Sequence, residues 1–151
     1  MWDINKILFP LDLDFKEGNT KMVRYLKAIA ERNQAEIHLL HVLPDPTEYY
    51  GFYAVNMNFS ELSQSMHETA LKKIQAFVDE SSLSNMNVQI HVVSGRPTDE
   101  IINFAENRGM DVIMMGTHGR RGLEETFFGS VVRSVIKLSP VPVLTVNPLR
   151  H

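Results

Sequence analysis

The chain has 151 residues, 44% of them apolar and 22% charged, with a formal net charge of -3 and no cysteine. At this length about 70% of the unfolded chain's surface becomes buried, so we expect one domain over residues 1–151. The lack of cysteine excludes disulfide frameworks and thiolate metal sites. The slight acidic excess argues against a nucleic-acid partner, which requires a concentrated patch of Lys and Arg.

Hydropathy sets a second limit on the function. No apolar run approaches the roughly 20 residues that cross a bilayer, and the N-terminus shows no secretory signal pattern. We therefore expect a cytoplasmic protein that makes no membrane contact.

The first half of the chain alternates apolar runs with amphipathic helical patterns. Lys6 to Leu11 form a nearly continuous apolar run, which predicts a strand covered on both faces. Asn19 or Thr20 is the predicted cap of a following helix, and Ala35 to Val42 form a second strand. Ser60 is the predicted cap of a helix whose apolar positions keep helical spacing for about five turns.

The second half continues the alternation. Asn87 to Val93 alternate as a third strand, and a helix opens at Pro97 and stops at Gly109. Asp111 to Met115 form a fourth strand, and a last helix precedes a fifth strand at Val141 to Val146. Strands that alternate with helices in this way predict a parallel sheet with helices on both faces.

A glycine-rich stretch follows the fourth predicted strand. It reads Gly116-Thr-His-Gly119, then nine residues, then Gly129-Ser130 at the start of the last helix. Glycines let the backbone approach an anion closely, and a helix start offers N–H groups beside the serine hydroxyl. In open parallel sheets, ligands lie beyond the carboxyl ends of the strands. A nucleotide is therefore predicted there, with Asp12 accepting from ribose hydroxyls or from the adenine amine.

Three motifs occur together in chain order: Pro10-x-Asp12, Gly95-x-Pro97 and the glycine pattern from Gly116 to Ser130. With them the whole chain resembles the universal stress proteins, and the glycine spacing resembles their ATP-binding branch. The resemblance implies an α/β sandwich of strand order 3-2-1-4-5, of the adenine nucleotide α-hydrolase-like type. It also implies a regulatory stress-response role, a homodimer, and binding of ATP, or of ADP or AMP, with Mg²⁺ or Mn²⁺.

The same resemblance assigns binding residues. It implies that Pro10, Asp12 and Val42 surround the adenosine, with the Val42 backbone at the adenine edge. The implied phosphate contacts come from Gly116, Gly119, Gly129, Ser130 and Val131. It assigns no catalytic residue and no metal ligand.

One departure from the family concerns the turn after the first strand. Many members have Asp-Gly-Ser, whereas this chain reads Asp12-Leu13-Asp14, which removes a flexible glycine and a hydroxyl and adds a carboxylate. Asp14 has two interpretations: a ligand for a metal carried in by the phosphates, or a solvated loop residue.

The last predicted strand has a physical reason to pair with a second copy. Val141 to Val146 form an edge of apolar β-formers, which proteins rarely leave uncovered. The identity of any other protein partner is left open by the sequence.

Several alternatives stay open. An ATP-binding regulator is favoured over a slow ATP hydrolase or nucleotide-using transferase, because no acid that holds a metal is recognisable beside a residue that positions a nucleophile. A structural dimer without nucleotide requires the glycine pattern to be accidental.

His118 is expected to shape its turn more than to assist hydrolysis. The aromatic-rich segment from Asp45 to Phe59 is a lid or partner surface, or a loop packed on nearby helices.

Overall fold

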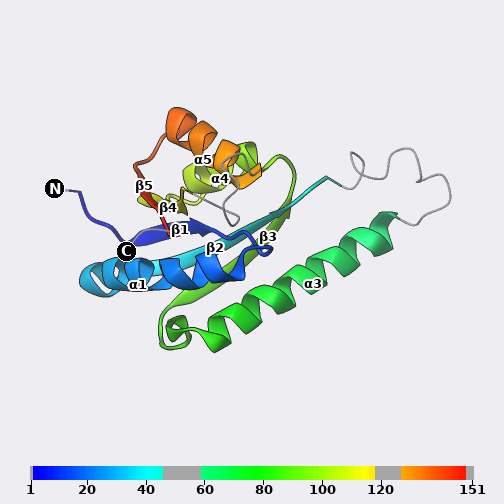
Figure 1. The fold of residues 1–151 in the computed structure, drawn as a ribbon. Coiled ribbons are helices and arrows are strands. Elements are labelled where there is room, and N and C mark those ends of the chain that lie inside the picture. The colour runs from blue at the N-terminus through cyan, green and yellow to red at the C-terminus, as the bar shows by residue number, and fades with distance from the viewer. Residues whose placement is uncertain (1, 46–58, 118–126, 149–151) are drawn as a thin grey trace.

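A computed structural model describes residues 2–45, 59–117 and 127–148 of the chain (Figure 1). The strands are β1 (Lys6–Pro10), β2 (Glu36–Leu43), β3 (Val88–Ser94), β4 (Val112–Gly116) and β5 (Val143–Val146). The helices are α1 (Lys16–Asn33), α3 (Phe59–Glu80), α4 (Pro97–Asn107) and α5 (Phe127–Leu138), with a short 3-10 helix η2 (Ser82–Asn85). None of the helices in these ranges is long and apolar enough to cross a membrane.

The five strands form one parallel sheet in the order β3-β2-β1-β4-β5. This confirms the predicted fold class and strand order. From β1 the chain builds outward to β2 and β3, and then returns to place β4 on the other side of β1. The strand order therefore reverses between β1 and β4, which is where open parallel sheets bind ligands.

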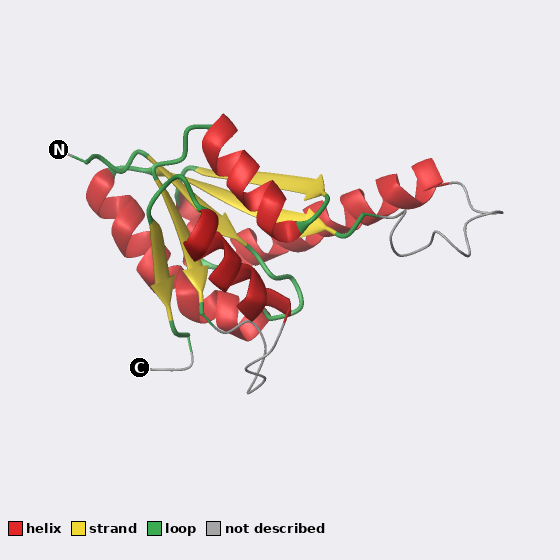
Figure 2. Cartoon of the chain, turned by 90° about the horizontal axis from the view of Figure 1, so that it is seen from above, coloured by secondary structure: helices red, strands yellow, loops and turns green. Residues whose placement is uncertain are grey.

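Helices cover both faces of the sheet. Figure 2 shows α4 and α5 in front of the sheet and α1 and α3 behind it. Alternate residues of β1 serve the two sides: Ile7 and Phe9 join the core under α1 and α3, and Leu8 joins the core under α4 and α5. Because β1 and β4 are buried on both faces, their sequences are continuous apolar runs.

The predicted caps of the first two helices are wrong. Helix α1 begins at Lys16 after Phe15, with no side-chain cap, so Asn19 and Thr20 lie inside the helix. The buried ring of Phe15 packs on Gly18, where a Cβ would collide with it, so packing sets this helix start.

The other boundaries differ from the predicted ones by small shifts. Helix α3 begins at Phe59, so Ser60 lies within it, and α4 ends at Asn107 shortly before Gly109. Strand β5 begins at Val143 where Val141 was expected. These shifts leave the order of elements as predicted.

Two histidines on neighbouring strands, His38 of β2 and His91 of β3, form a hydrogen-bonded pair with nearly parallel rings. The rings of His38 and His91 lie 5.1 Å apart, and Nδ1 of His38 is 2.9 Å from Nε2 of His91. Phe104 of α4 packs against the His91 ring at 4.7 Å. Nε2 of His38 is buried and lies 3.2 Å from Glu36 Oε1, without the geometry of a hydrogen bond. The hydrogen bond between the rings requires one of its two nitrogens to be unprotonated.

This pair makes the stability dependent on pH. Burial lowers the pKa of His91, and the nearby His38 and Arg108 lower it further. Below the ordinary value of about 6.5, the unfolded chain binds a proton that the folded chain resists. The free energy of unfolding should therefore decrease as the pH is lowered through about 6.5.

Urea unfolding at a series of pH values measures this effect. Replacing His91→Phe keeps an aromatic ring against Phe104 and should flatten the pH dependence. The matched variant His67→Phe, on α3, should keep the parent's slope. Equal slopes for His91→Phe and the parent would contradict the assignment.

Candidate functional site

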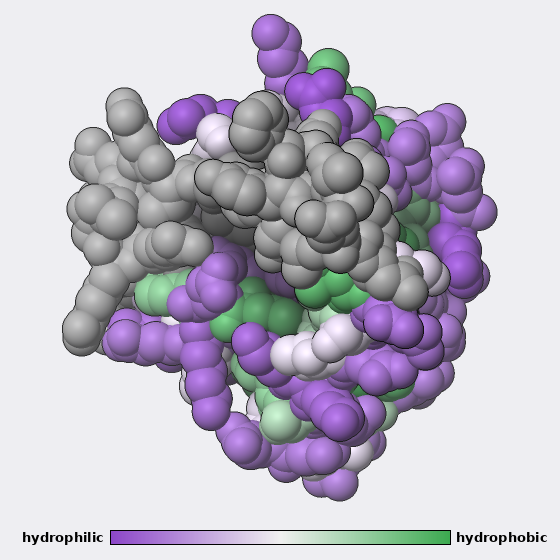
Figure 3. Space-filling model, turned by 90° about the vertical axis from the view of Figure 1, so that its right-hand side faces the viewer, coloured by the Kyte–Doolittle hydropathy of each residue, from purple (hydrophilic) through white to green (hydrophobic). Residues whose placement is uncertain are grey.

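Because the five strands are parallel, their carboxyl ends lie on one side of the sheet, which we call the carboxyl edge; Figure 1 shows β2 ending toward the right. Strand β1 ends at Pro10, β2 at Leu43 and β4 at Gly116. Figure 3 shows the molecule from the right-hand side of Figure 1, where apolar residues reach the surface among polar ones.

The turn after β1 holds Asp12 in a defined geometry. Pro10 is buried and pairs with Leu40, and the next residue, Leu11, donates its N–H to the Leu40 carbonyl at 2.8 Å. Asp12 is half-buried, and its Oδ1 accepts the N–H of Asp14 at 3.0 Å. In the described chain, Oδ1 makes this bond and Oδ2 makes none, so Oδ2 is the oxygen that can serve a ligand.

The turn does not need the glycine that many family members carry. Among the residues the structure describes, Gln34 is the one non-glycine with positive φ, so Leu13 and Asp14 adopt ordinary backbone angles. Leu13 packs against the core under α1 and α3, and Asp14 is exposed. The described ranges contain no group of three His, Asp or Glu side chains placed to hold a metal ion.

The other side of the site is the start of α5. This helix begins at Phe127, two residues before the predicted start, so Gly129 and Ser130 lie in its first turn and Val131 follows it. Gly129 is buried, Ser130 is exposed and Val131 is 4% exposed within the core under α4 and α5. The Val131 side chain therefore cannot reach a ligand and its N–H belongs to the helix, whereas Ser130 lies at the surface. The positive end of the helix dipole lies at this turn and favours an anion.

Val42 lies near the end of β2, paired with Val93, and is partly buried against the core under α4 and α5. The structure brings Pro10, Asp12, Val42, Gly116 and residues 129–131 to the carboxyl side of the sheet. Gly119 and His118 lie outside the described residues, as does the interior of the predicted aromatic segment, residues 46–58.

Sequence reasoning missed two polar residues beside this turn. Asn19 is 8% exposed, and its Nδ2 donates to the Asp12 carbonyl at 2.6 Å. Nδ1 of His41 lies 2.9 Å from the Leu11 carbonyl. A signal for Asn19 was present, because it shares the apolar face of α1 with Met22 and Val23, where an amide needs a hydrogen-bond partner.

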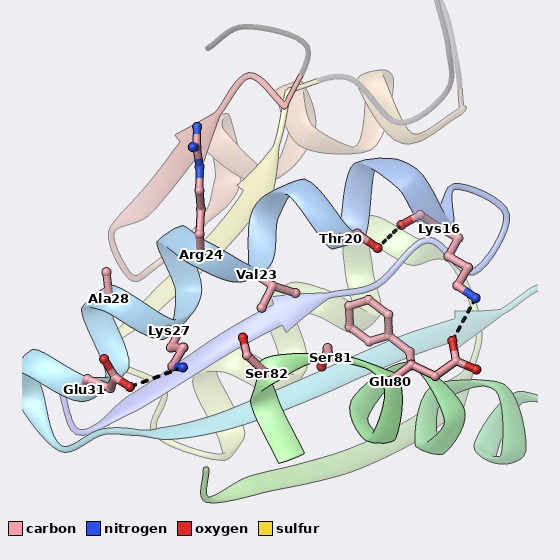
Figure 4. A pocket seen from close by; sticks show the side chains of 11 residues that line it. Lys16, Thr20, Val23, Arg24, Lys27, Ala28, Glu31, Glu80, Ser81 and Ser82 are labelled. Atoms are coloured by element: carbon pink, nitrogen blue, oxygen red, sulfur yellow. Dashed lines mark hydrogen bonds and ion pairs between the residues drawn. The ribbon is translucent and has the colours of Figure 1, made fainter. Parts of the chain in front are cut away.

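The larger hollow described on the molecule lies elsewhere. A groove of about 490 Å³ runs between α1 and η2, and a smaller one of about 250 Å³ shares Lys16, Phe77 and Glu80 with it (Figure 4). Two of its lysines pair with its own carboxylates, with Lys16 Nζ 2.8 Å from Glu80 Oε2 and Lys27 Nζ 3.7 Å from Glu31 Oε1. Because none of the predicted binding residues lines the groove, we assign the candidate site to the carboxyl edge.

The fold and this edge define an open parallel α/β protein with a candidate ligand site at the strand-order reversal. Residues 3–147 match the model of the universal stress protein family. The chain is 33% identical over 154 residues to universal stress protein MJ0577 of Methanocaldococcus jannaschii, with 94% of each chain covered. The chain belongs to the universal stress protein family.

Solved structures agree with this assignment. The structure of MJ0577 has a TM-score of 0.74 at 32% identity and covers 97% of this chain and 98% of that chain. A universal stress protein in complex with cAMP has a TM-score of 0.58 at 16% identity, with 97% and 98% covered. One from Archaeoglobus fulgidus in complex with dAMP has a TM-score of 0.58 at 18% identity, with 97% and 100% covered. The latter two share the fold.

Gly116 provides a test of whether this edge is built around a ligand. It is buried, it is not among the positive-φ glycines, and a Cβ on it would lie 3.7 Å from Met22 Sδ and from the Pro148 ring, which is ordinary contact. Neither the backbone nor the described packing requires glycine here. Gly116→Ala should leave the free energy of unfolding unchanged or raise it by about 0.4 to 1 kcal/mol.

Urea unfolding followed by circular dichroism measures this change. Gly109→Ala is the matched control, because Gly109 has a φ of 63° and alanine there should lose about 1 kcal/mol. A comparable loss in Gly116→Ala would show that glycine serves the fold at this position.

Proposed function

We propose that this protein binds ATP, or a related adenine nucleotide, across the carboxyl edge of its sheet. The observation that carries this proposal is that one side of the strand-order reversal favours a hydrogen-bond donor and the other side favours an anion. Asp12 presents a carboxylate oxygen on one side, and α5 presents its N-terminal turn and the exposed Ser130 on the other. A nucleoside phosphate has donors at one end and an anion at the other.

These charges also orient the nucleotide. The carboxylates of Asp12 and the exposed Asp14 repel phosphate, so the phosphates belong over the start of α5. Asp12 Oδ2 then accepts from ribose hydroxyls or from the adenine amine, and the Val42 backbone lies at the adenine edge. Mg²⁺ or Mn²⁺ is assigned to the phosphates, as the family resemblance implies.

The relatives support an adenine nucleotide as the ligand. Two proteins that share this fold were solved with cAMP and with dAMP. We further propose that nucleotide binding serves a regulatory role in the stress response, in which the ligand changes the contacts of the protein and is not turned over.

Two variants test the orientation by equilibrium dialysis with ATP and with adenosine. Ser130→Glu places a carboxylate where the phosphates belong. It should therefore raise the dissociation constant for ATP about tenfold or more, which corresponds to about 1.4 kcal/mol of binding free energy. It should leave adenosine affinity unchanged. Asp12→Ala should weaken both ligands by the same factor, because both carry the ribose and the adenine. A parent chain that binds no ATP, or a Ser130→Glu variant that weakens both ligands equally, would contradict the proposal.

We propose that the functional form is a homodimer through β5. Four large apolar side chains are exposed in the described chain, and three belong to α5 and β5: Ile136, Leu138 and Leu144. Strand β5 lies at the edge of the sheet, with an unpaired side. Leu144 is paired with Met114 of the core under α1 and α3, so it faces away from α5. Pairing of β5 with a second copy would cover the strand edge and the Leu144 side chain.

A charge at position 144 in β5 should separate the subunits. Leu144 is 40% exposed, so lysine there fits the monomer, but desolvating it in an interface is unfavourable. Leu144→Lys should sediment as a monomer in analytical ultracentrifugation. Ser94→Lys, on the opposite edge strand, should leave the parent's mass unchanged. A dimer that survives Leu144→Lys would rule out this interface.

A further inference from the structure

Asn19 is an amide buried on the apolar face of α1. It is 8% exposed, and Met22 and Val23 on the same face are core residues. A buried amide is tolerated where it is hydrogen-bonded. Its Nδ2 donates to the Asp12 carbonyl at 2.6 Å, and the same carbonyl accepts the N–H of Phe15 at 3.2 Å. The peptide group that follows Asp12 is therefore held by α1.

His41 holds the peptide group that precedes Asp12. Its Nδ1 lies 2.9 Å from the Leu11 carbonyl. Because a carbonyl oxygen only accepts, Nδ1 carries the proton and donates. The N–H of Leu11 is also bonded, to the Leu40 carbonyl at 2.8 Å. Strand β2 thus fixes Leu11 as α1 fixes the far side of Asp12.

These two contacts act on the backbone angles of Asp12. The angles φ and ψ of a residue are set by the planes of its two flanking peptide groups. Asn19 and His41 hold one peptide group each, and the N–H of Asp14 holds Oδ1 at 3.0 Å. The direction of Oδ2 is then determined before any ligand arrives. A side chain ordered in advance loses less conformational freedom on binding.

We propose that Asn19 and His41 are positioning residues of the nucleotide site, which aim the Asp12 carboxylate at the ligand. The turn Asp12-Leu13-Asp14 lacks the glycine and serine found in many family members, and its conformation is held by these two neighbouring side chains. This inference rests on the proposed function, since it takes an adenine nucleotide as the ligand of Asp12.

A double-mutant cycle tests the inference. Asn19→Leu removes the donor, keeps a similar volume and suits its apolar surroundings. The control is Asn33→Leu, on the same helix, where an exposed asparagine donates to the Ile29 carbonyl at 2.8 Å. Dissociation constants for ATP are measured by equilibrium dialysis in the parent background and in Asp12→Ala. Circular dichroism verifies that each variant is folded.

Asn19→Leu should raise the dissociation constant for ATP about fivefold or more in the parent. In Asp12→Ala the increase should be less than about twofold, because that background has no carboxylate to position. Asn33→Leu should change neither. Unchanged affinity in Asn19→Leu, or equal weakening in both backgrounds, would overturn the inference, since a general loss of structure acts in both.

Two further outcomes are also decisive. If Asn19→Leu does not fold, His41→Phe is put through the same cycle with the same criteria. A parent chain that binds no ATP would refute the proposed function itself, and the ligand role of Asn19 and His41 with it. Normal binding by the parent with an unaffected Asn19→Leu would refute only the positioning role.

Discussion

The burial of β1 on both faces is the constraint on which the rest of the structure depends. Its residues alternate between two cores, and β2 and β4 pair along its two sides. Asp111 anchors its start, because one carboxylate oxygen accepts the N–H groups of Asn5 and Lys6 at 2.8 and 2.9 Å. The residue that leaves the end of β1 must therefore emerge where the strand order reverses. Asp12 lies at the carboxyl edge for this reason.

The elements of the fold were predictable because the spacing of apolar residues along the chain shows which faces of each element are buried. Strands covered on both faces show continuous apolar runs, and α1 and α3 show helical spacing. The start of α1 was not predictable from caps, because Phe15 packing on Gly18 determines it. Polar cap signals at Asn19 and Thr20 pointed to the wrong residue, since the amide of Asn19 is used by the Asp12 turn.

The candidate site likewise has a part that could be predicted from the sequence and a part that could not. Topology alone brings the residues after β1 and β4 to one edge, so Asp12, Gly116 and the start of α5 could be placed from the sequence. The contact of His41 with Leu11 and the pairing of His38 with His91 join residues 30 and 53 positions apart in the chain. No periodicity encodes such contacts, because they depend on the register between neighbouring strands.

Titration of the nitrogen-15-labelled protein with ATP and Mg²⁺, followed in a nitrogen-15 correlation spectrum, shows which amides the nucleotide affects. The largest shift changes should fall on the amides of Leu11, Asp12, Val42, Gly116 and residues 129–131. Changes concentrated instead at Lys16, Lys27 and Ser82 would place the nucleotide in the groove beside α1 and contradict binding at the carboxyl edge, as would a spectrum that ATP leaves unchanged.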